Sequence, residues 1–74
     1  MTSDLFERCC DVLFGPGWVP AQVATAFHVQ LPTACAWLVG TRDVPPGVCT
    51  EIRGMLQDKR LLLDVVAQEM DEEA

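Results

Sequence analysis

The chain has 74 residues, half of them apolar, and its five Lys and Arg against eleven Asp and Glu give a formal charge of −6. This length and composition predict one small folded domain and exclude global disorder. The excess of acid argues against non-specific attraction to nucleic acid or to an anionic membrane, since both interactions need cations. Four acids crowd the end of the chain, so residues 71–74 are expected to form a solvated acidic tail.

The cysteines and the single histidine show no metal-binding pattern. Cys9, Cys10, Cys35 and Cys49 include no C-x-x-C pair, and His28 is not spaced with any of them as a zinc ligand. We therefore expect the adjacent Cys9 and Cys10 to be buried small hydrophobes, with no metal and no cofactor. The N-terminus lacks the basic and apolar regions of a signal peptide, which predicts a cytoplasmic protein with reduced thiols. Gly, Pro, Gln and His interrupt the uncharged stretch 12–41, so no membrane span is expected.

A first helix is predicted over about residues 4–13. Asp4 and Glu7 have the spacing of a capping box, with Thr2 and Ser3 as alternative caps. Glycines and a proline at 15–17 end the helix. Helical spacing predicts an inward face with two flanking residues: Leu5, Cys9, Val12 and Leu13 on the face, and Phe6 and Cys10 beside it.

Two short helices joined by a tight turn are predicted between residues 20 and 40. The first runs from Pro20 to about residue 27, and Trp18 before it is expected to anchor the core. His28 falls at the turn, where positive φ is needed and histidine is better tolerated than most residues with a Cβ. The second runs from about residue 31 to 39, and Gly40 ends it. Their expected inward residues are Val23, Ala24 and Phe27, then Ala34, Trp37 and Leu38.

The last predicted helix covers about residues 46–70 and is too long for so small a core. Its earlier apolar residues can close the core over the other helices. Its later ones recur at a spacing of three and four, which is typical of a helix with a partner helix. We predict a dimer seam formed by Leu62, Leu63, Val66 and Met70. The alternative is that this helix folds back as a hairpin onto the first one.

Four runs of sequence resemble a known family: L-F-G-P-G-W (13–18), A-T-A-F-H-V (24–29), T-A-C-A-W-L-V-G (33–40) and P-P-G-V-C-T-E-I-R-G-M-L (45–56). They are similar to the small helix-turn-helix regulators of bacteria and phages. The resemblance covers about residues 5–63 and implies an all-α fold of four to five helices, like the phage Cro and repressor DNA-binding domains. It places one helix-turn-helix domain at residues 1–70, with its motif at about 20–40.

The resemblance also implies a function and a set of contacts. Such proteins bind operator DNA as dimers, with the second helix of the motif in the major groove. At the matching positions Gln30 and Thr33 would contact bases, and Gln22, Thr41 and Arg42 would contact phosphates. This is a small set for an operator binder, because no Asp, Glu, Lys or Arg lies between Val12 and Thr41.

The same helix supports a second hypothesis, in which the scaffold binds a protein. Its outer positions would form an uncharged apolar patch typical of an interface core: Leu31, Pro32, Cys35, Ala36 and Val39. A phage-encoded inhibitor of a host protein, such as an anti-CRISPR or another anti-defence protein, fits this pattern. No acid–base or nucleophile–base pair is recognisable, so an enzyme is not expected. The family resemblance places the DNA-binding regulator slightly ahead.

Overall fold

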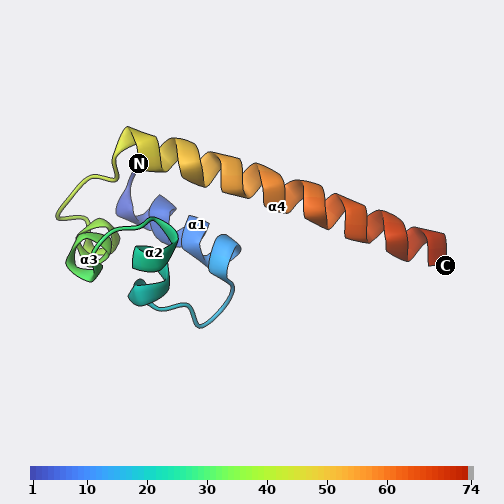
Figure 1. The fold of residues 1–74 in the computed structure, drawn as a ribbon, viewed down its shortest axis with the longest axis horizontal. Coiled ribbons are helices and arrows are strands. Elements are labelled where there is room, and N and C mark those ends of the chain that lie inside the picture. Colours follow the sequence, from blue (N-terminus) through green and yellow to red (C-terminus); the bar gives the residue numbers. More distant parts are fainter. Residues whose placement is uncertain (74) are drawn as a thin grey trace.

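The computed structural model describes residues 1–73, which form four α-helices and no strand (Figure 1). The helices are α1 (Ser3–Phe14), α2 (Pro20–Ala26), α3 (Leu31–Val39) and α4 (Pro46–Glu73). Helices α1, α2 and α3 pack into a small body, and α4 runs past α1 and projects far beyond it (Figure 1). The prediction of an all-helical chain with a long C-terminal helix is confirmed.

Local capping groups set the ends of α1. The Thr2 side chain accepts a hydrogen bond from the Leu5 N–H at 3.1 Å, so Thr2, one of the two alternative caps, is the N-cap in place of Asp4. At the other end the Gly15 N–H donates to the Asp11 carbonyl, and Gly15 has a φ of 80°. Helix α1 is therefore one residue longer at each end than predicted.

The predicted inward face of α1 is wrong in part. The buried residues are Phe6, Cys9 and Cys10, whereas Leu5 and Val12 are 42% and 51% exposed. The helix is turned so that Phe6, predicted as a flanking residue, faces α2 and α3.

Helices α2 and α3 are joined by a turn whose geometry agrees with the prediction. The Val29 N–H donates to the Ala24 carbonyl and the His28 N–H to the Thr25 carbonyl, which is the bonding of a Schellman C-cap. This cap needs one residue in the left-handed region, and His28 occupies it with a φ of 56°. Helix α3 has the predicted bounds, and Gly40 ends it with a φ of 85°.

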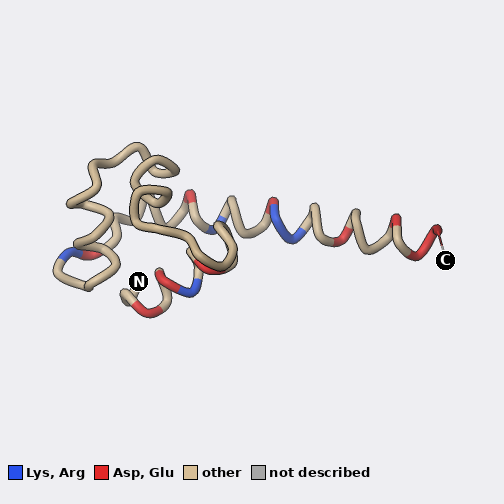
Figure 2. Tube along the Cα trace, turned by 90° about the horizontal axis from the view of Figure 1, so that it is seen from below, with Lys and Arg blue, Asp and Glu red and all other residues tan. Residues whose placement is uncertain are grey.

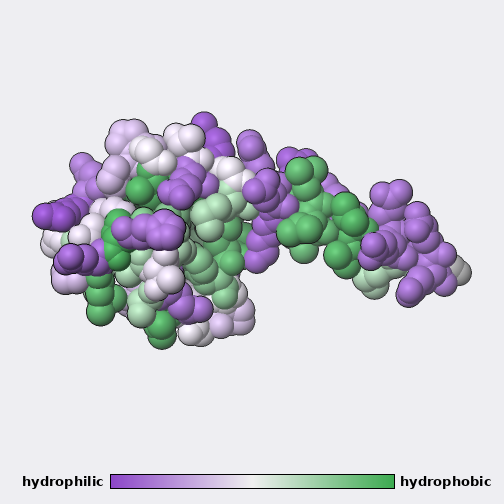
Figure 3. Space-filling model, viewed as in Figure 1, coloured by the Kyte–Doolittle hydropathy of each residue, from purple (hydrophilic) through white to green (hydrophobic). Residues whose placement is uncertain are grey.

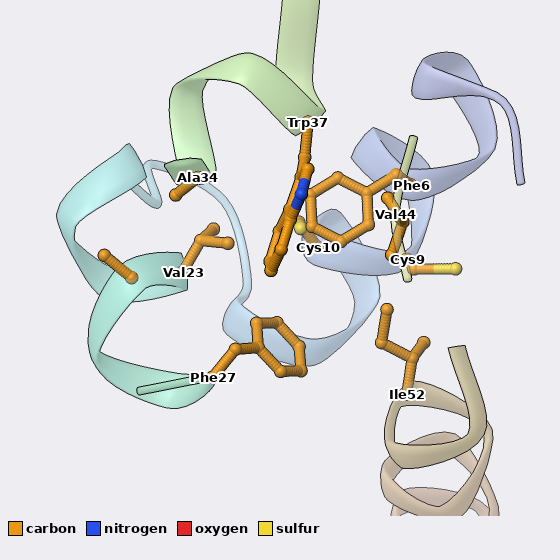
Figure 4. Close-up of a cluster of buried hydrophobic side chains, with 10 residues drawn as sticks. Phe6, Cys9, Cys10, Val23, Phe27, Ala34, Trp37, Val44 and Ile52 are labelled. Carbon is orange, nitrogen blue, oxygen red and sulfur yellow. The ribbon is translucent and has the colours of Figure 1, made fainter. Parts of the chain in front are cut away.

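The core contains ten buried side chains and lies between all four helices (Figure 4). Three rings meet at its centre: the Phe6 centroid lies 5.9 Å from Trp37 and 6.4 Å from Phe27, and Phe27 and Trp37 are also 6.4 Å apart. The Trp37 contacts are edge-on, which is a favourable arrangement for aromatic pairs. The full set is Phe6, Cys9, Cys10, Val23, Ala24, Phe27, Ala34, Trp37, Val44 and Ile52.

Trp18 has a smaller role in packing than predicted. Its ring is half-buried against the edge of the core. Its Nε1–H donates to Asp11 Oδ1 at 2.6 Å, which ties the loop after α1 back to that helix.

Only the first part of α4 packs on the body. Ile52 is buried, and the half-buried Lys59 donates from Nζ to the Val12 carbonyl at the end of α1. Every residue from 60 to 73 is exposed. Helix α4 is unbroken to Glu73, so it does not fold back as a hairpin, and residues 71–73 of the expected tail are helical. Ala74 lies outside the described residues.

Candidate functional site

Helix α3 is held against the body by one side, which leaves its other side exposed. Ala34 and Trp37 are 0% and 3% exposed and face the core, where Trp37 contacts Phe6 and Phe27. At the N-terminal end of α3, Gln30, Leu31 and Pro32 are exposed. A rigid helix with one outer face is the arrangement that a recognition surface requires.

The two residues predicted to contact bases lie together at the start of α3. The Gln30 carbonyl caps the helix by accepting from the Thr33 and Ala34 N–H groups, but its side chain makes no capping bond. The amide of this exposed side chain therefore remains available to a ligand. Thr33 is half-buried, so it contributes less surface than Gln30.

The predicted phosphate contacts lie at two other places. Thr41 and Arg42 lie just beyond the C-terminal end of α3, where both backbone N–H groups donate to the Ala36 carbonyl at 3.1 and 3.3 Å. The Thr41 hydroxyl also donates to that carbonyl, at 3.4 Å. Gln22 lies on α2, and its Oε1 accepts from the Val19 N–H at 2.8 Å as a helix cap. Its amide N–H₂ is left as a donor.

The five polar residues therefore do not form one cluster. They lie on three segments: α2, the start of α3 and the loop after α3. Helix α3 has nine residues and is about 13 Å long, so the groups at its two ends are far apart.

Charge is nearly absent from the α2–α3 surface (Figure 2). Most charges lie on α1 and α4, and one cation beside one anion lies in the loop after α3 (Figure 2). These two are Arg42 and Asp43, both exposed. Among the described residues, Arg42 is the one Lys or Arg in α2, α3 and the loop after them, and its neighbour Asp43 reduces its field.

The apolar patch of α3 is exposed at its ends and half-buried in its middle. Val39 is 71% and Leu31 48% exposed, and Pro32 is also exposed. Cys35 and Ala36, predicted to be exposed, are half-buried. The patch is therefore smaller than the sequence indicates, and Val39 is its most prominent side chain.

A second apolar surface lies on the projecting part of α4 (Figure 3). The predicted seam residues are all exposed: Leu62 66%, Leu63 60%, Val66 52% and Met70 68%. Leu61 and Val65 on other sides of the helix are 64% and 53% exposed. This is the largest concentration of exposed aliphatic side chains on the chain, and single monomeric domains rarely carry one.

The cysteines are free thiols, and Cys9 and Cys10 are buried. Burial raises the pKa of the Cys10 thiol from 9.0 to about 11, because its thiolate would be poorly solvated there, and the nearby Cys9, Asp11 and Glu7 add to the effect. Residues 1–73 hold no group of three or more His, Cys, Asp or Glu arranged to bind a metal ion. They also contain no helix that is both long and apolar enough to cross a membrane.

Comparisons with protein-family models, with curated proteins and with solved structures found no match for this chain. The functional argument therefore depends on the residues and their arrangement.

Sequence reasoning missed two features near these surfaces. The contact of Lys59 with Val12 fixes where α4 leaves the body, and nothing in either residue's local sequence signals it. The second, the capping role of Gln22, has a recognisable signal. Gln22 lies three residues after Val19, the N-cap, which is the spacing at which a Gln side chain reaches back to the cap N–H.

Proposed function

We propose that this protein is a small helix-turn-helix regulator of the phage or mobile-element type that binds operator DNA as a dimer in the cytoplasm. It is a binding protein and not an enzyme. Helix α3 lies in the major groove, with Gln30 and Thr33 at base edges. Gln22, Thr41 and Arg42 contact phosphates on either side. Helix α4 joins two copies through its exposed apolar residues.

The observation that carries this proposal is the joint between α2 and α3. Four residues, 27–30, connect the helices, and the turn is closed by the left-handed His28. A short turn of this kind is typical of helix-turn-helix motifs, in which the second helix is presented outward. The exposed Gln30 at the start of α3 supports the proposal, because an amide there can bond an adenine edge.

Electrostatics determines how strongly such a protein binds. Arg42 is the only Lys or Arg between residues 12 and 52, so few counterions are released when DNA is bound. We therefore expect micromolar affinity at low salt, and a dimer that doubles each contact.

Fluorescence anisotropy with labelled duplexes from the region upstream of the protein's own gene tests the proposal. Binding is measured at about 50 mM salt and then at rising salt. Arg42→Ala is expected to lower the slope of log K against log salt by about one for each protomer, and so by about two for the bound dimer. Gln30→Ala is expected to weaken operator binding about tenfold while leaving the slope unchanged.

Two matched variants serve as controls. Arg8→Ala on α1 removes the same charge from an exposed site away from α3, and Gln57→Ala removes the same amide from α4. Both are expected to bind as the wild type does. Absence of binding to every duplex at tens of micromolar, or equal effects of Arg42→Ala and Arg8→Ala, contradicts the proposal.

One observation favours a second candidate function, binding of a protein by α3. Val39 is 71% exposed on a surface without charge, beside the exposed Leu31 and Pro32. If α3 binds a protein, Val39→Glu is expected to abolish binding of that protein, whereas Arg42→Ala is expected to have little effect. Val12→Glu is the matched control, because Val12 is 51% exposed on α1. If the Val39→Glu variant still binds the partner protein, this candidate function is contradicted.

A further inference from the structure

Six residues of α4, five of them apolar and one a lysine, form a stripe along the helix. Its members alternate at spacings of four and three: Ile52, Leu56, Lys59, Leu63, Val66 and Met70. This is the heptad spacing of a coiled coil. The first three lie against the body, where Ile52 is 2% exposed and the other two are half-buried. The last three lie on the same face, and nothing in residues 1–73 covers them.

The C-terminal half of α4 carries only acids, whereas its N-terminal half carries charges of both signs (Figure 2). Residues 61–73 carry five acids and no Lys or Arg. Residues 46–60 carry two acids, Glu51 and Asp58, and three of the chain's five cations, Arg53, Lys59 and Arg60, so this half has a net positive charge. The acids at the tip also lie next to the negative end of the helix macrodipole, and the last turn contains no base to offset them. A cationic partner at the tip would relieve this repulsion.

From these two patterns we propose that α4 pairs with α4 of a second copy in the antiparallel direction. This deepens the dimer of the proposed function and rests on it. A parallel pair would place five acids against five acids. An antiparallel pair places the acidic tip of each copy beside Lys59 and Arg60 of the other.

The heptad positions specify where the twofold axis lies. In an antiparallel coiled coil, the two kinds of seam position pack against each other across the interface. Leu63 then meets Val66 of the second copy, and Met70 meets Lys59, about an axis between Asp64 and Val65. Leu62 lies at the edge of the same seam. At each end of the interface, Met70 of one copy reaches the exposed Val12 of the other. The carbonyl of that Val12 already accepts a hydrogen bond from Lys59 of its own chain.

Pulsed electron paramagnetic resonance on spin-labelled dimers measures the direction of pairing. Cys35→Ser and Cys49→Ser remove the partly exposed thiols, and the label is attached at Thr50→Cys or at Gln68→Cys. Antiparallel pairing separates the two copies of residue 50 by about 44 Å along the axis and those of residue 68 by about 10 Å. Parallel pairing keeps both pairs of labels within about 20 Å, given helix axes 8–10 Å apart.

Neutralising the acids at the tip of α4 provides a second measurement. The dimer dissociation constant is expected to rise if the helices pair antiparallel and to fall if they pair parallel. Glu69→Gln, Glu72→Gln and Glu73→Gln together remove attraction in an antiparallel dimer, so the dimer dissociation constant is expected to rise about tenfold, the effect of a few exposed ion pairs. In a parallel dimer the same variant removes repulsion, and the constant falls. Asp4→Asn with Glu7→Gln on α1 is the control, and circular dichroism checks that α4 stays helical.

The outcomes separate the inference from the proposed function. A short distance at residue 50, or tighter association of the neutralised variant, overturns the antiparallel direction but leaves the dimer. A wild-type chain that sediments as a monomer at about 100 μM, well above the micromolar range, overturns both the direction and the dimer. Operator binding is measured separately by anisotropy, so its failure is distinguished from a wrong direction of pairing.

Discussion

Leu5 and Phe6 are neighbours on α1, and replacing each of them tests which side of this helix carries the core. Phe6 is fully buried, and its ring lies edge-on to Trp37 and tilted against Phe27. Leu5 is 42% exposed at the edge of a shallow hollow between α1 and α4. Helical spacing alone predicts the reverse, with Leu5 on the buried face and Phe6 beside it. Their substitutions are therefore expected to differ in the order that the structure determines.

The structure sets the size of each effect. Phe6→Ala is expected to cost about 3–5 kcal/mol, because it leaves a cavity at the centre of the core. A domain of this size has a free energy of unfolding of about 4–11 kcal/mol, so that variant can unfold outright. Phe6→Leu keeps most of the volume and loses two aromatic contacts, which costs about 2 kcal/mol. Leu5→Ala is expected to cost about 1 kcal/mol, since much of that side chain is already in water.

Urea unfolding at one fixed protein concentration, followed by circular dichroism at 222 nm, measures these differences. A fixed concentration is needed because association through α4 would add to the stability. Arg8→Ala on the exposed side of α1 is the control for helix propensity. The reasoning is refuted if Leu5→Ala lowers the free energy of unfolding by as much as Phe6→Leu.

Two further expectations concern the turn and the buried thiol. His28→Gly should raise the free energy of unfolding by about 0.5–1 kcal/mol, because glycine adopts a φ of 56° without strain, whereas His28→Val should lower it. Thermal melts check both, and a His28→Gly variant less stable than the wild type would argue against strain at this residue. For Cys10, the unfolded chain loses its thiol proton near pH 9.0, but the folded chain keeps it to about pH 11. Stability from this group is therefore complete below pH 9.0 and decreases between these two values. Urea titrations should show a smaller decrease in Cys10→Ala, and an equal decrease would exclude the thiol as its cause.

The sequence alone determined where the helices begin and end to within a few residues, because these features depend on short stretches of adjacent residues. Gly40 and Pro32 define α3, whose bounds agree with the structure to the residue. The position of His28 in the left-handed region follows from the need to close the turn between two short helices. The exposed apolar side of α4 was also foreseeable, because a helix of that length exceeds the core of a 74-residue chain.

Only the tertiary structure decided which sides of the helices are buried. Apolar residues surround most of α1, so spacing could not distinguish Leu5 from Phe6, and the contact of Phe6 with Trp37 made the choice. For the same reason the middle of α3, at Cys35 and Ala36, is less exposed than its sequence indicates. The point where α4 leaves the body depends on Lys59 and Val12, which are far apart in the chain. Helix capping depends on neighbouring residues, so the sequence could determine it. Burial depends on how helices that are distant in sequence cross, so it required the tertiary structure.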